Sequence, residues 1–261
     1  MTGAPVVALL TAGSKNSKTS NAASLTVMRS DISPKDAVDQ GLDNAVCGGC
    51  ECRKGGTGPR CYTHGLMLVN GLSSMYKGLP NRQNRSAWSA EELGQWLRFA
   101  RLNEGAQAFR SCSYGDIGAL PVDVQHKLND ARLRGGLSPR GYTHQWRDPE
   151  LQHLKTWHMA SVTNTADDEH ARSLGWRTYL GLVGAVRNNR AVLCPASKEA
   201  GHLTTCAQCT LCSGGARPTA PSVYIPDHGP AAQGARVAAA ALARKGALRQ
   251  SQEVRTEYAQ V

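Results

Sequence analysis

Four cysteines in the carboxyl-terminal part of the chain have the spacing of metal ligands. Cys206, Cys209 and Cys212 form a C-x-x-C-x-x-C run, and Cys194 lies upstream with a proline directly after it. Such a run lets one tight loop point three sulfur atoms at the corners of an iron–sulfur cube, while a fourth cysteine from a neighbouring loop completes the ligand set. Structural zinc sites, the alternative, more often have two separated C-x-x-C pairs. The spacing therefore favours a [4Fe-4S] cluster.

A second group of cysteines lies in a glycine-rich segment nearer the amino terminus. Cys47, Cys50 and Cys61 are its candidate metal ligands. Glycines allow the backbone to fold tightly around an ion and let N–H groups point at sulfur. Cys52 follows Cys50 by only two positions, so the sequence leaves open whether both can face one metal. Cys52 and the isolated Cys112 are therefore not assigned as ligands.

The two groups offer seven candidate thiols, and a cube takes four. In one arrangement the four carboxyl-terminal cysteines bind a closed cluster and the amino-terminal three form a separate, open site. In the other, a single cluster draws on both groups and joins distant parts of the chain. The sequence leaves both arrangements open, with the carboxyl-terminal group as the ligand core in each.

An open site would support catalysis. A cluster with three thiolate ligands has one iron corner free to act as a Lewis acid on a carbonyl or a water molecule. Asp116, His144 and His228 each follow a β-like run, and functional groups of parallel α/β folds gather at the carboxyl ends of the strands. We expect these three side chains to meet near the cysteine loops and to supply a general base. The expected reaction is hydrolysis or dehydration of a small molecule.

The elements that must position these residues alternate between strands and helices. Ser89 begins the clearest helix, because S-A-E-E fits a capping box and apolar residues then recur on one face. A second helix follows Pro121, and a last strand is expected at 222–225. Short β-like runs and helical runs alternate between these points. The alternation predicts an α/β fold of parallel strands with crossover helices, as a complete or partial (βα) barrel or an open doubly wound sheet, with cysteine-rich metal-binding loops.

The composition along the chain predicts three regions. Residues 1–40 are rich in Ser, Thr, Ala and Asn and are expected to form an extended arm; residues 41–229 form the α/β metal-binding domain; and residues 230–261 form a basic, alanine-rich helical tail. A chain of 261 residues can bury a core without disulfide staples. Its nine cysteines are odd in number and clustered, which indicates metal ligands in a reducing, cytoplasmic compartment. Neither a signal peptide nor a membrane-spanning segment is evident.

The net charge is compatible with a nucleic-acid partner. The chain has 30 basic and 20 acidic residues, a formal charge of +10, although no block of Lys and Arg stands out. Motifs for serine hydrolysis, nucleotide hydrolysis and dinucleotide binding are absent, as is the cysteine triplet of S-adenosylmethionine radical enzymes. A non-catalytic nucleic-acid-binding protein with a structural iron–sulfur or zinc site is therefore the alternative to an enzyme. A structural protein with a protein partner is a third reading.

The cysteine groups and the residues between them resemble a family of tailed phages and viral metagenomes, the gene-product-88-like proteins. The matching positions are Asn16, Lys18 and Thr19; Cys47, Cys50, Cys61 and Tyr62; Gly115 and Asp116; Tyr142, Thr143 and His144; Cys194, Pro195 and Ala196; Thr205, Cys206, Cys209, Leu211 and Cys212; and His228 and Gly229. They span about residues 14 to 229. In the family, three residues commonly separate the opening cysteines, whereas two separate Cys47 from Cys50. The resemblance implies a viral protein of the host cytoplasm that binds iron–sulfur, without implying a settled activity.

Overall fold

The computed structural model describes residues 3–13, 19–56, 61, 63–64, 67–182 and 191–226. The strands are β1 (Val6–Thr11), β2 (Ala23–Arg29), β3 (Ala108–Arg110), β4 (Ser138–Arg140), β5 (Tyr142–Thr143), β6 (Met159–Val162), β7 (Thr178–Leu182), β8 (Ala191–Leu193) and β9 (Ser222–Pro226). The α-helices are α1 (Pro34–Asp39), α2 (Asn44–Cys47), α3 (Ser73–Lys77), α4 (Ala90–Asn103), α5 (Val122–Arg134) and α6 (Thr165–Ser173). A π-helix, η1 (Met67–Leu72), and 3-10 helices η2 (Leu79–Asn81), η3 (Ile117–Ala119), η4 (Pro149–Thr156), η5 (Lys198–Ala200) and η6 (Gly214–Ala216) complete the set.

The strands form two sheets that share one segment of chain. The first sheet has the order β1-β2-β3-β4 and the second the order β5-β6-β7-β9-β8. Gly141 alone separates β4 from β5, and backbone bonds tie this segment to both sides, from Ser111 N to Arg140 O and from Met159 N to Gly141 O. These backbone bonds link the two sheets at Gly141.

All strand pairs except β1–β2 are parallel, which confirms the predicted α/β class with parallel strands. The strand at 222–225 is also confirmed, as β9. In the described part of the chain no ladder closes the sheets into a ring, so a (βα) barrel stays a prediction.

The amino-terminal segment differs from the expected extended arm. It supplies β1, β2 and α1, and the β2 side chains are buried except at Arg29. Alternation of apolar and polar residues is hidden in β2 because a strand covered on both faces buries every position. The predicted tail at 230–261 lies outside the described residues.

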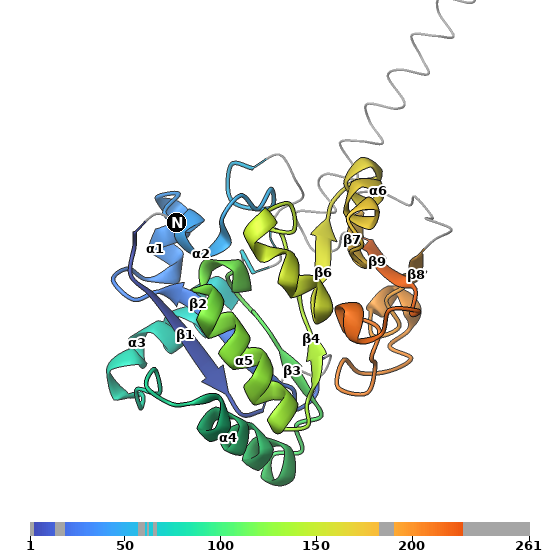
Figure 1. Cartoon of the computed structure of the whole chain (residues 1–261). Helices are drawn as coiled ribbons and strands as arrows, with labels where there is room; N and C mark the ends of the chain where they lie inside the picture. Colours follow the sequence, from blue (N-terminus) through green and yellow to red (C-terminus); the bar gives the residue numbers. More distant parts are fainter. Residues whose placement is uncertain are drawn as a thin grey trace, which may run out of the picture.

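Helices α4 and α5 cover the first sheet, and α6 packs on β6 and β7 (Figure 1). The predicted capping box of α4 is confirmed: Ser89 Oγ accepts from Glu92 N at 3.2 Å, and Glu92 Oε2 accepts from Ser89 N at 2.7 Å. Gly94 allows α4 to approach α5, because a Cβ at this position would come within 2.6 Å of Arg134 Cβ. The helix predicted after Pro121 is confirmed as α5.

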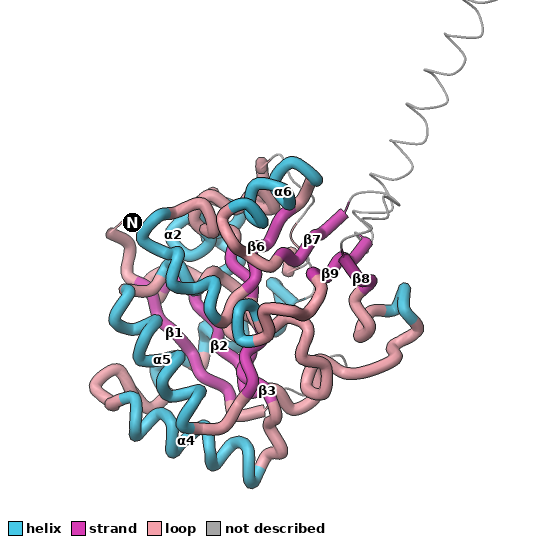
Figure 2. The backbone as a smooth tube through the Cα atoms, turned by 45° about the vertical axis from the view of Figure 1, so that its right-hand side comes forward, coloured by secondary structure: helices cyan, strands magenta, loops and turns pink. Residues whose placement is uncertain are grey.

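The described residues form one large and one small cluster of buried side chains. The large cluster runs under both sheets and includes Leu25, Phe109 and Leu180. The small one lies on the other face of the second sheet, where Met159, Val223 and Ile225 pack against residues 194–212. The segment from β8 to β9 that covers this face is almost entirely loop (Figure 2). A loop cover of this kind buries little apolar surface of its own, so it needs another source of stability.

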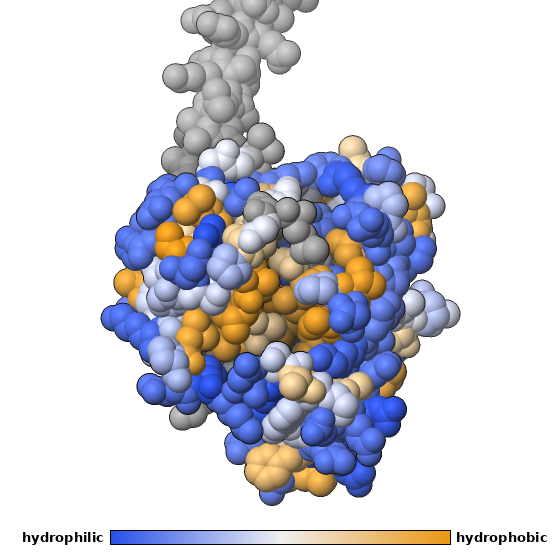
Figure 3. All heavy atoms as spheres, turned by 60° about the vertical axis from the view of Figure 1, so that its left-hand side comes forward, coloured by the Kyte–Doolittle hydropathy of each residue, from blue (hydrophilic) through white to orange (hydrophobic). Residues whose placement is uncertain are grey.

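The surface is mostly hydrophilic. On the face shown in Figure 3, apolar side chains gather in a central hollow and hydrophilic side chains surround them. No helix in the described ranges is long and apolar enough to cross a membrane.

A buried histidine at the junction of the sheets makes a prediction for acid stability. His158 is fully buried, and its Nε2 lies 2.6 Å from Ser111 Oγ. Burial, helped by the charges of Arg132 and His153, lowers the pKa of His158 to about 3. The unfolded chain therefore takes up a proton below pH ~6.5 that the folded chain does not take up until about pH 3. Its contribution to stability is complete above pH ~6.5 and falls by roughly 1.4 kcal/mol per pH unit between these values.

Urea unfolding at a series of pH values measures this contribution. On acidification, the free energy of unfolding of the His158→Gln variant is expected to fall less steeply than that of the unmodified chain. The difference corresponds to the uptake of about one proton on unfolding. Equal pH slopes for the two proteins would contradict the prediction.

Candidate metal centre and its hollow

The amino-terminal cysteine loop lies over the carboxyl ends of parallel strands, where the sequence predicted a site. Helix α2 ends at Cys47, and the loop that follows contacts the segments after β3 and β5. One link runs from Asp116 N to Val46 O, at 2.7 Å. The loop and the residues after β5 therefore come from distant parts of the sequence but form one site.

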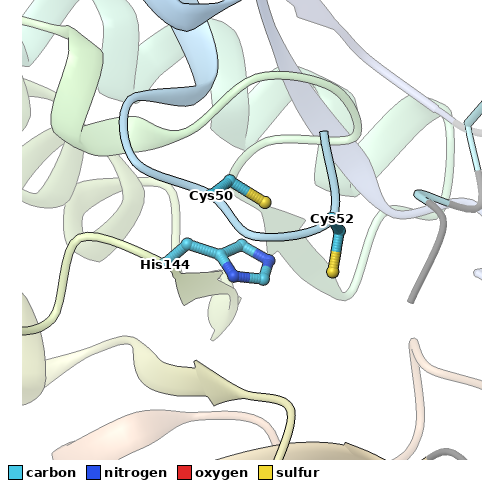
Figure 4. A group of neighbouring side chains, drawn as sticks. All are labelled: Cys50, Cys52 and His144. Atoms are coloured by element: carbon cyan, nitrogen blue, oxygen red, sulfur yellow. The ribbon is translucent and has the colours of Figure 1, made fainter. Parts of the chain in front are cut away.

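Three possible ligand atoms meet in this loop. The sulfur atoms of Cys50 and Cys52 and a ring nitrogen of His144 all lie within 4.8 Å of one another (Figure 4). This is the one group of three such ligands within that limit among the residues that the structure describes. The Cys50 thiol is hydrogen-bonded to both Cys52 and His144. Cys52, which the sequence left unassigned, thus faces the same space as Cys50, because the turn at 51–52 reverses the backbone between them.

A buried ion pair closes the loop behind these ligands. Arg53, the residue after Cys52, donates from Nε and Nη2 to Asp43 Oδ1 at 3.0 and 2.7 Å. The Asp43 side chain is only 1% exposed, so this charge-assisted pair is shielded from solvent. Cys61 N donates to Cys52 O at 2.9 Å and brings Cys61 back to the loop. The loop is therefore held in shape by groups that are not ligands themselves.

Gln145 links the loop to the segment after β5. Its Nε2 donates to Cys47 O at 2.9 Å, and its Oε1 accepts from Gly49 N at 3.4 Å. Gly48 has a φ of 55° and lies against this side chain, where an added Cβ would come within 2.6 Å of the amide. A glycine is required here for the backbone conformation and for the close approach of Gln145.

Asp116 positions His144 rather than facing the open side of the site. Its Oδ2 accepts from His144 N at 2.8 Å, and its Oδ1 accepts from Thr143 Oγ1 and Gly118 N at 2.7 and 2.9 Å. The residue is 4% exposed. Three donors satisfy this buried carboxylate, so the structure favours a positioning role over the predicted role of general base.

Removal of the Asp116 carboxylate should loosen the site. In Asp116→Ala the buried His144 N–H and Thr143 hydroxyl lose their acceptor, at a cost of about 3 kcal/mol in the free energy of unfolding. Metal affinity at the Cys50–Cys52–His144 group is expected to fall about 10- to 100-fold, as it does when residues that orient ligands are changed. Urea unfolding and competition with a chelator measure the two effects. Asp148→Ala is the matched control, because Asp148 caps an exposed helix start by accepting from Glu150 N; unchanged metal affinity in Asp116→Ala would contradict the assignment.

Without a cation, the thiols of Cys47, Cys50 and Cys61 are neutral. The hydrogen bond between Cys50 and Cys52, followed by burial, raises the pKa of Cys50, against the effect of His144. Burial raises the pKa of Cys47 and of Cys61, and the charges of neighbouring thiols and of Asp43 add to it. Burial opposes protonation of His144, but Cys50 and nearby carboxylates raise its pKa overall. A metal ion would therefore displace protons on binding.

A small hollow opens beside the three ligands. It is lined by Gly49, Glu51, His144, Trp146, Arg147, Ser161, Val162, Thr163 and Asp167. Glu51 Oε2 accepts a hydrogen bond from Thr163 Oγ1 at 2.6 Å. Arg147 pairs with Asp167 and lies over the Trp146 ring, 4.0 Å from its centroid. Glu51 is a carboxylate in this hollow that was not among the residues predicted from the sequence. Its position between Cys50 and Cys52 was the signal that could have indicated it.

The carboxyl-terminal thiols form a separate group on one face of the second sheet. Cys194 directly follows β8, and Cys206, Cys209 and Cys212 lie in the loop before η6. Burial raises the pKa of Cys212, and the other three thiols of the group raise it further. The same group contacts the stacked rings of Tyr142 and Tyr179, whose centroids are 4.5 Å apart.

The predicted site residues thus fall into distinct places. Cys47, Cys50 and Cys61 gather near His144 and Asp116, and the thiols that affect one another's pKa are those within each group. Cys112 is buried at the end of β3, with a φ of 61°. His228 lies outside the described residues.

Comparison with known proteins gives no relative: no protein-family model matches the chain, and neither a curated protein nor a solved structure matches it.

Proposed function

We propose that this chain is a metalloenzyme of the hydrolase or lyase type, with its catalytic metal on the Cys50–Cys52–His144 group. The observation that carries the proposal is the meeting of two sulfur atoms and one imidazole nitrogen within 4.8 Å, beside a hollow lined by polar side chains. Sites that close around a metal for structural reasons have four protein ligands, whereas catalytic sites keep one position open.

The donor set fits a single ion. Tetrahedral zinc with bonds of about 2.3 Å to sulfur places two thiolates about 3.8 Å apart. The sulfur atoms of Cys50 and Cys52 lie within 4.8 Å of each other, which is compatible with this distance. Two cysteines and one histidine are an established ligand set of catalytic zinc. When bound, the metal would act as a Lewis acid and lower the pKa of a water molecule. Zinc is thus the favoured occupant of this group, with iron as the competitor.

The residues around the ligands have separable tasks in this proposal. His144 serves as a ligand instead of the general base predicted from the sequence. Asp116 holds the backbone of His144 in place through the bond to its N–H. Glu51 lies in the hollow and is the carboxylate that can accept a proton from water or substrate, with Thr163 orienting it.

The carboxyl-terminal thiols are proposed to hold a closed [4Fe-4S] cluster. Their spacing supports it, as does the resemblance to the tailed-phage family. Among the described residues, no three atoms of this group come within the 4.8 Å that joins the other group, and a cube separates its thiolates more widely than one ion does. The chain would therefore have two separate metal centres. The Cys50–Cys52–His144 group would be the catalytic centre, and the carboxyl-terminal thiols would hold the structural one. Thiol-rich centres of this kind require a reducing compartment, which for a phage protein is the host cytoplasm.

Activity that depends on metal tests the proposal. The full chain, purified without oxygen, is assayed on a panel of simple esters and small hydroxy acids before and after treatment with a chelator, and again after zinc is restored. We expect loss of activity on chelation, recovery with zinc, and loss in Glu51→Gln with metal content unchanged. Equal rates with and without metal would refute a metalloenzyme; a gel shift of nucleic acid that weakens steeply with salt, without turnover, would support the non-catalytic alternative.

A further inference from the structure

Arg140 is a buried cation that forms no ion pair with an acidic side chain in the described part of the chain. It lies in β4 and is 5% exposed. Its Nε donates to Cys206 O at 2.9 Å, and its Nη1 donates to Pro139 O and Ser213 Oγ at 2.6 and 3.0 Å. These acceptors are neutral. The ionisable groups that act on Arg140 are the thiols Cys206, Cys209 and Cys212, together with another cation, Arg217.

Arg177 repeats this arrangement from the neighbouring sheet. Its Nη1 donates to Gly214 O at 2.9 Å, and its Nη2 donates to Leu211 O and Pro221 O at 2.7 and 2.5 Å. It precedes β7 and is partly buried. Cys212 is again the group whose ionised form would raise the pKa of the arginine, against the effect of burial. Two guanidinium groups therefore hold the cysteine loop by its carbonyl oxygens, and the same thiol, Cys212, acts electrostatically on both.

Each guanidinium also has one buried nitrogen without an acceptor. Among the described residues, Arg140 Nη2 and Arg177 Nε have no hydrogen-bond partner, and neither arginine forms an ion pair with a carboxylate. A buried charge that is unpaired costs several kcal/mol, so native proteins rarely leave one. With neutral thiols, the described part of this region would carry the two buried positive charges and the exposed Arg217, with no carboxylate paired to either buried guanidinium.

We propose that Arg140 and Arg177 are the counter-charges of an anionic metal centre on Cys194, Cys206, Cys209 and Cys212. Four thiolates around either a Zn²⁺ ion or an oxidised [4Fe-4S]²⁺ core carry a net charge of two minus, which two guanidinium groups balance. This inference rests on the proposed presence of metal at these thiols and does not depend on catalysis at the other centre. For a cluster it has a further consequence: reduction adds one electron from an external reductant, and nearby positive charge favours the more negative form.

The test uses the full chain with Cys50→Ser and Cys52→Ser, so that the carboxyl-terminal group is the principal metal site. Iron and sulfide are reconstituted without oxygen, and Arg140→Gln is compared with Arg132→Gln. Arg132 is the matched control, because it is 6% exposed and bonded to neutral acceptors, and no thiol acts on it. Arg177 is less buried, so Arg177→Gln provides a second comparison with the control if Arg140→Gln folds poorly.

We expect Arg140→Gln and Arg177→Gln to release iron to a chelator about tenfold faster than the control, in the range found for groups around metal ligands. An EPR-monitored titration should show the ratio of reduced to oxidised cluster about tenfold lower at a given potential, equivalent to ~59 mV for one electron. Arg140→Lys, which keeps the charge, should restore most of the difference. If zinc binds instead, its release to the chelator replaces the iron measurement.

Both glutamine variants behaving like Arg132→Gln would refute the counter-charge proposal alone. No uptake of iron or zinc by the parent chain would overturn both this proposal and the carboxyl-terminal cluster, while the metal on the Cys50–Cys52–His144 group would still be tested in the unmodified chain.

Discussion

Replacement of His144 by alanine is expected to abolish metal binding at the group that it forms with Cys50 and Cys52. Two thiolates in a loop cannot satisfy an ion that takes four ligands, so the loss of affinity should exceed the roughly 100-fold effect of changing a residue that only orients ligands. Hydrolytic activity should be lost with the metal. Cobalt(II), whose visible absorption reports thiolate ligation, measures binding directly.

The cobalt spectrum and the turnover of His144→Ala together distinguish a metal ligand from a general base. If His144 were only a base, His144→Ala would keep its cobalt spectrum and lose turnover, which would contradict the ligand assignment. His153→Ala is the matched control, because His153 is bonded to Gln125 Oε1 and is not part of the Cys50–Cys52–His144 group. We expect that variant to bind cobalt as the unmodified chain does.

The second large effect is expected from Cys212→Ser. The face of the second sheet near Cys212 is covered by loop, and only a small apolar cluster packs beneath it. Metal at these thiols would therefore supply much of the stability of the region, and a centre occupied at 1,000 times its dissociation constant contributes about 4 kcal/mol. Loss of the cluster should raise amide hydrogen exchange across residues 191–226.

Cys112→Ser controls for the loss of a buried thiol. Cys112 is 8% exposed and takes no part in either thiol group. It should keep its iron, its sulfide and slow exchange in 191–226. If Cys212→Ser also keeps full iron and sulfide, the carboxyl-terminal group is not the cluster site.

Helices with strong local signals could be predicted from the sequence. The capping box at Ser89 and the apolar face after it place α4 correctly, because those interactions lie within a few residues. Strand β2 could not be recognised, since burial on both faces removes its alternation and leaves a run that resembles an arm. The exchange of order between β8 and β9 is likewise set by tertiary pairing, and nothing in local spacing specifies it.

Part of the site could be predicted in the same way. The rule that functional groups follow strands predicted His144 and Asp116 near the cysteine loops, and in the structure both lie beside the first cysteine group. Their tasks could not be read, because Asp116 acts through donors that only the fold brings to it. Cys52 was not assigned, because its spacing from Cys50 does not reveal the turn between the two residues. Gln145 belongs to no sequence motif that would indicate its role.

Metal and sulfide analysis of the protein, purified without oxygen and combined with EPR, is the most direct test of two separate metal centres. We predict about four iron and four sulfide per chain, lost in Cys212→Ser, and one further metal ion that is lost in His144→Ala and kept in Cys212→Ser. A chain that carries no metal, or in which His144→Ala and Cys212→Ser lose the same metal together, would contradict two separate centres.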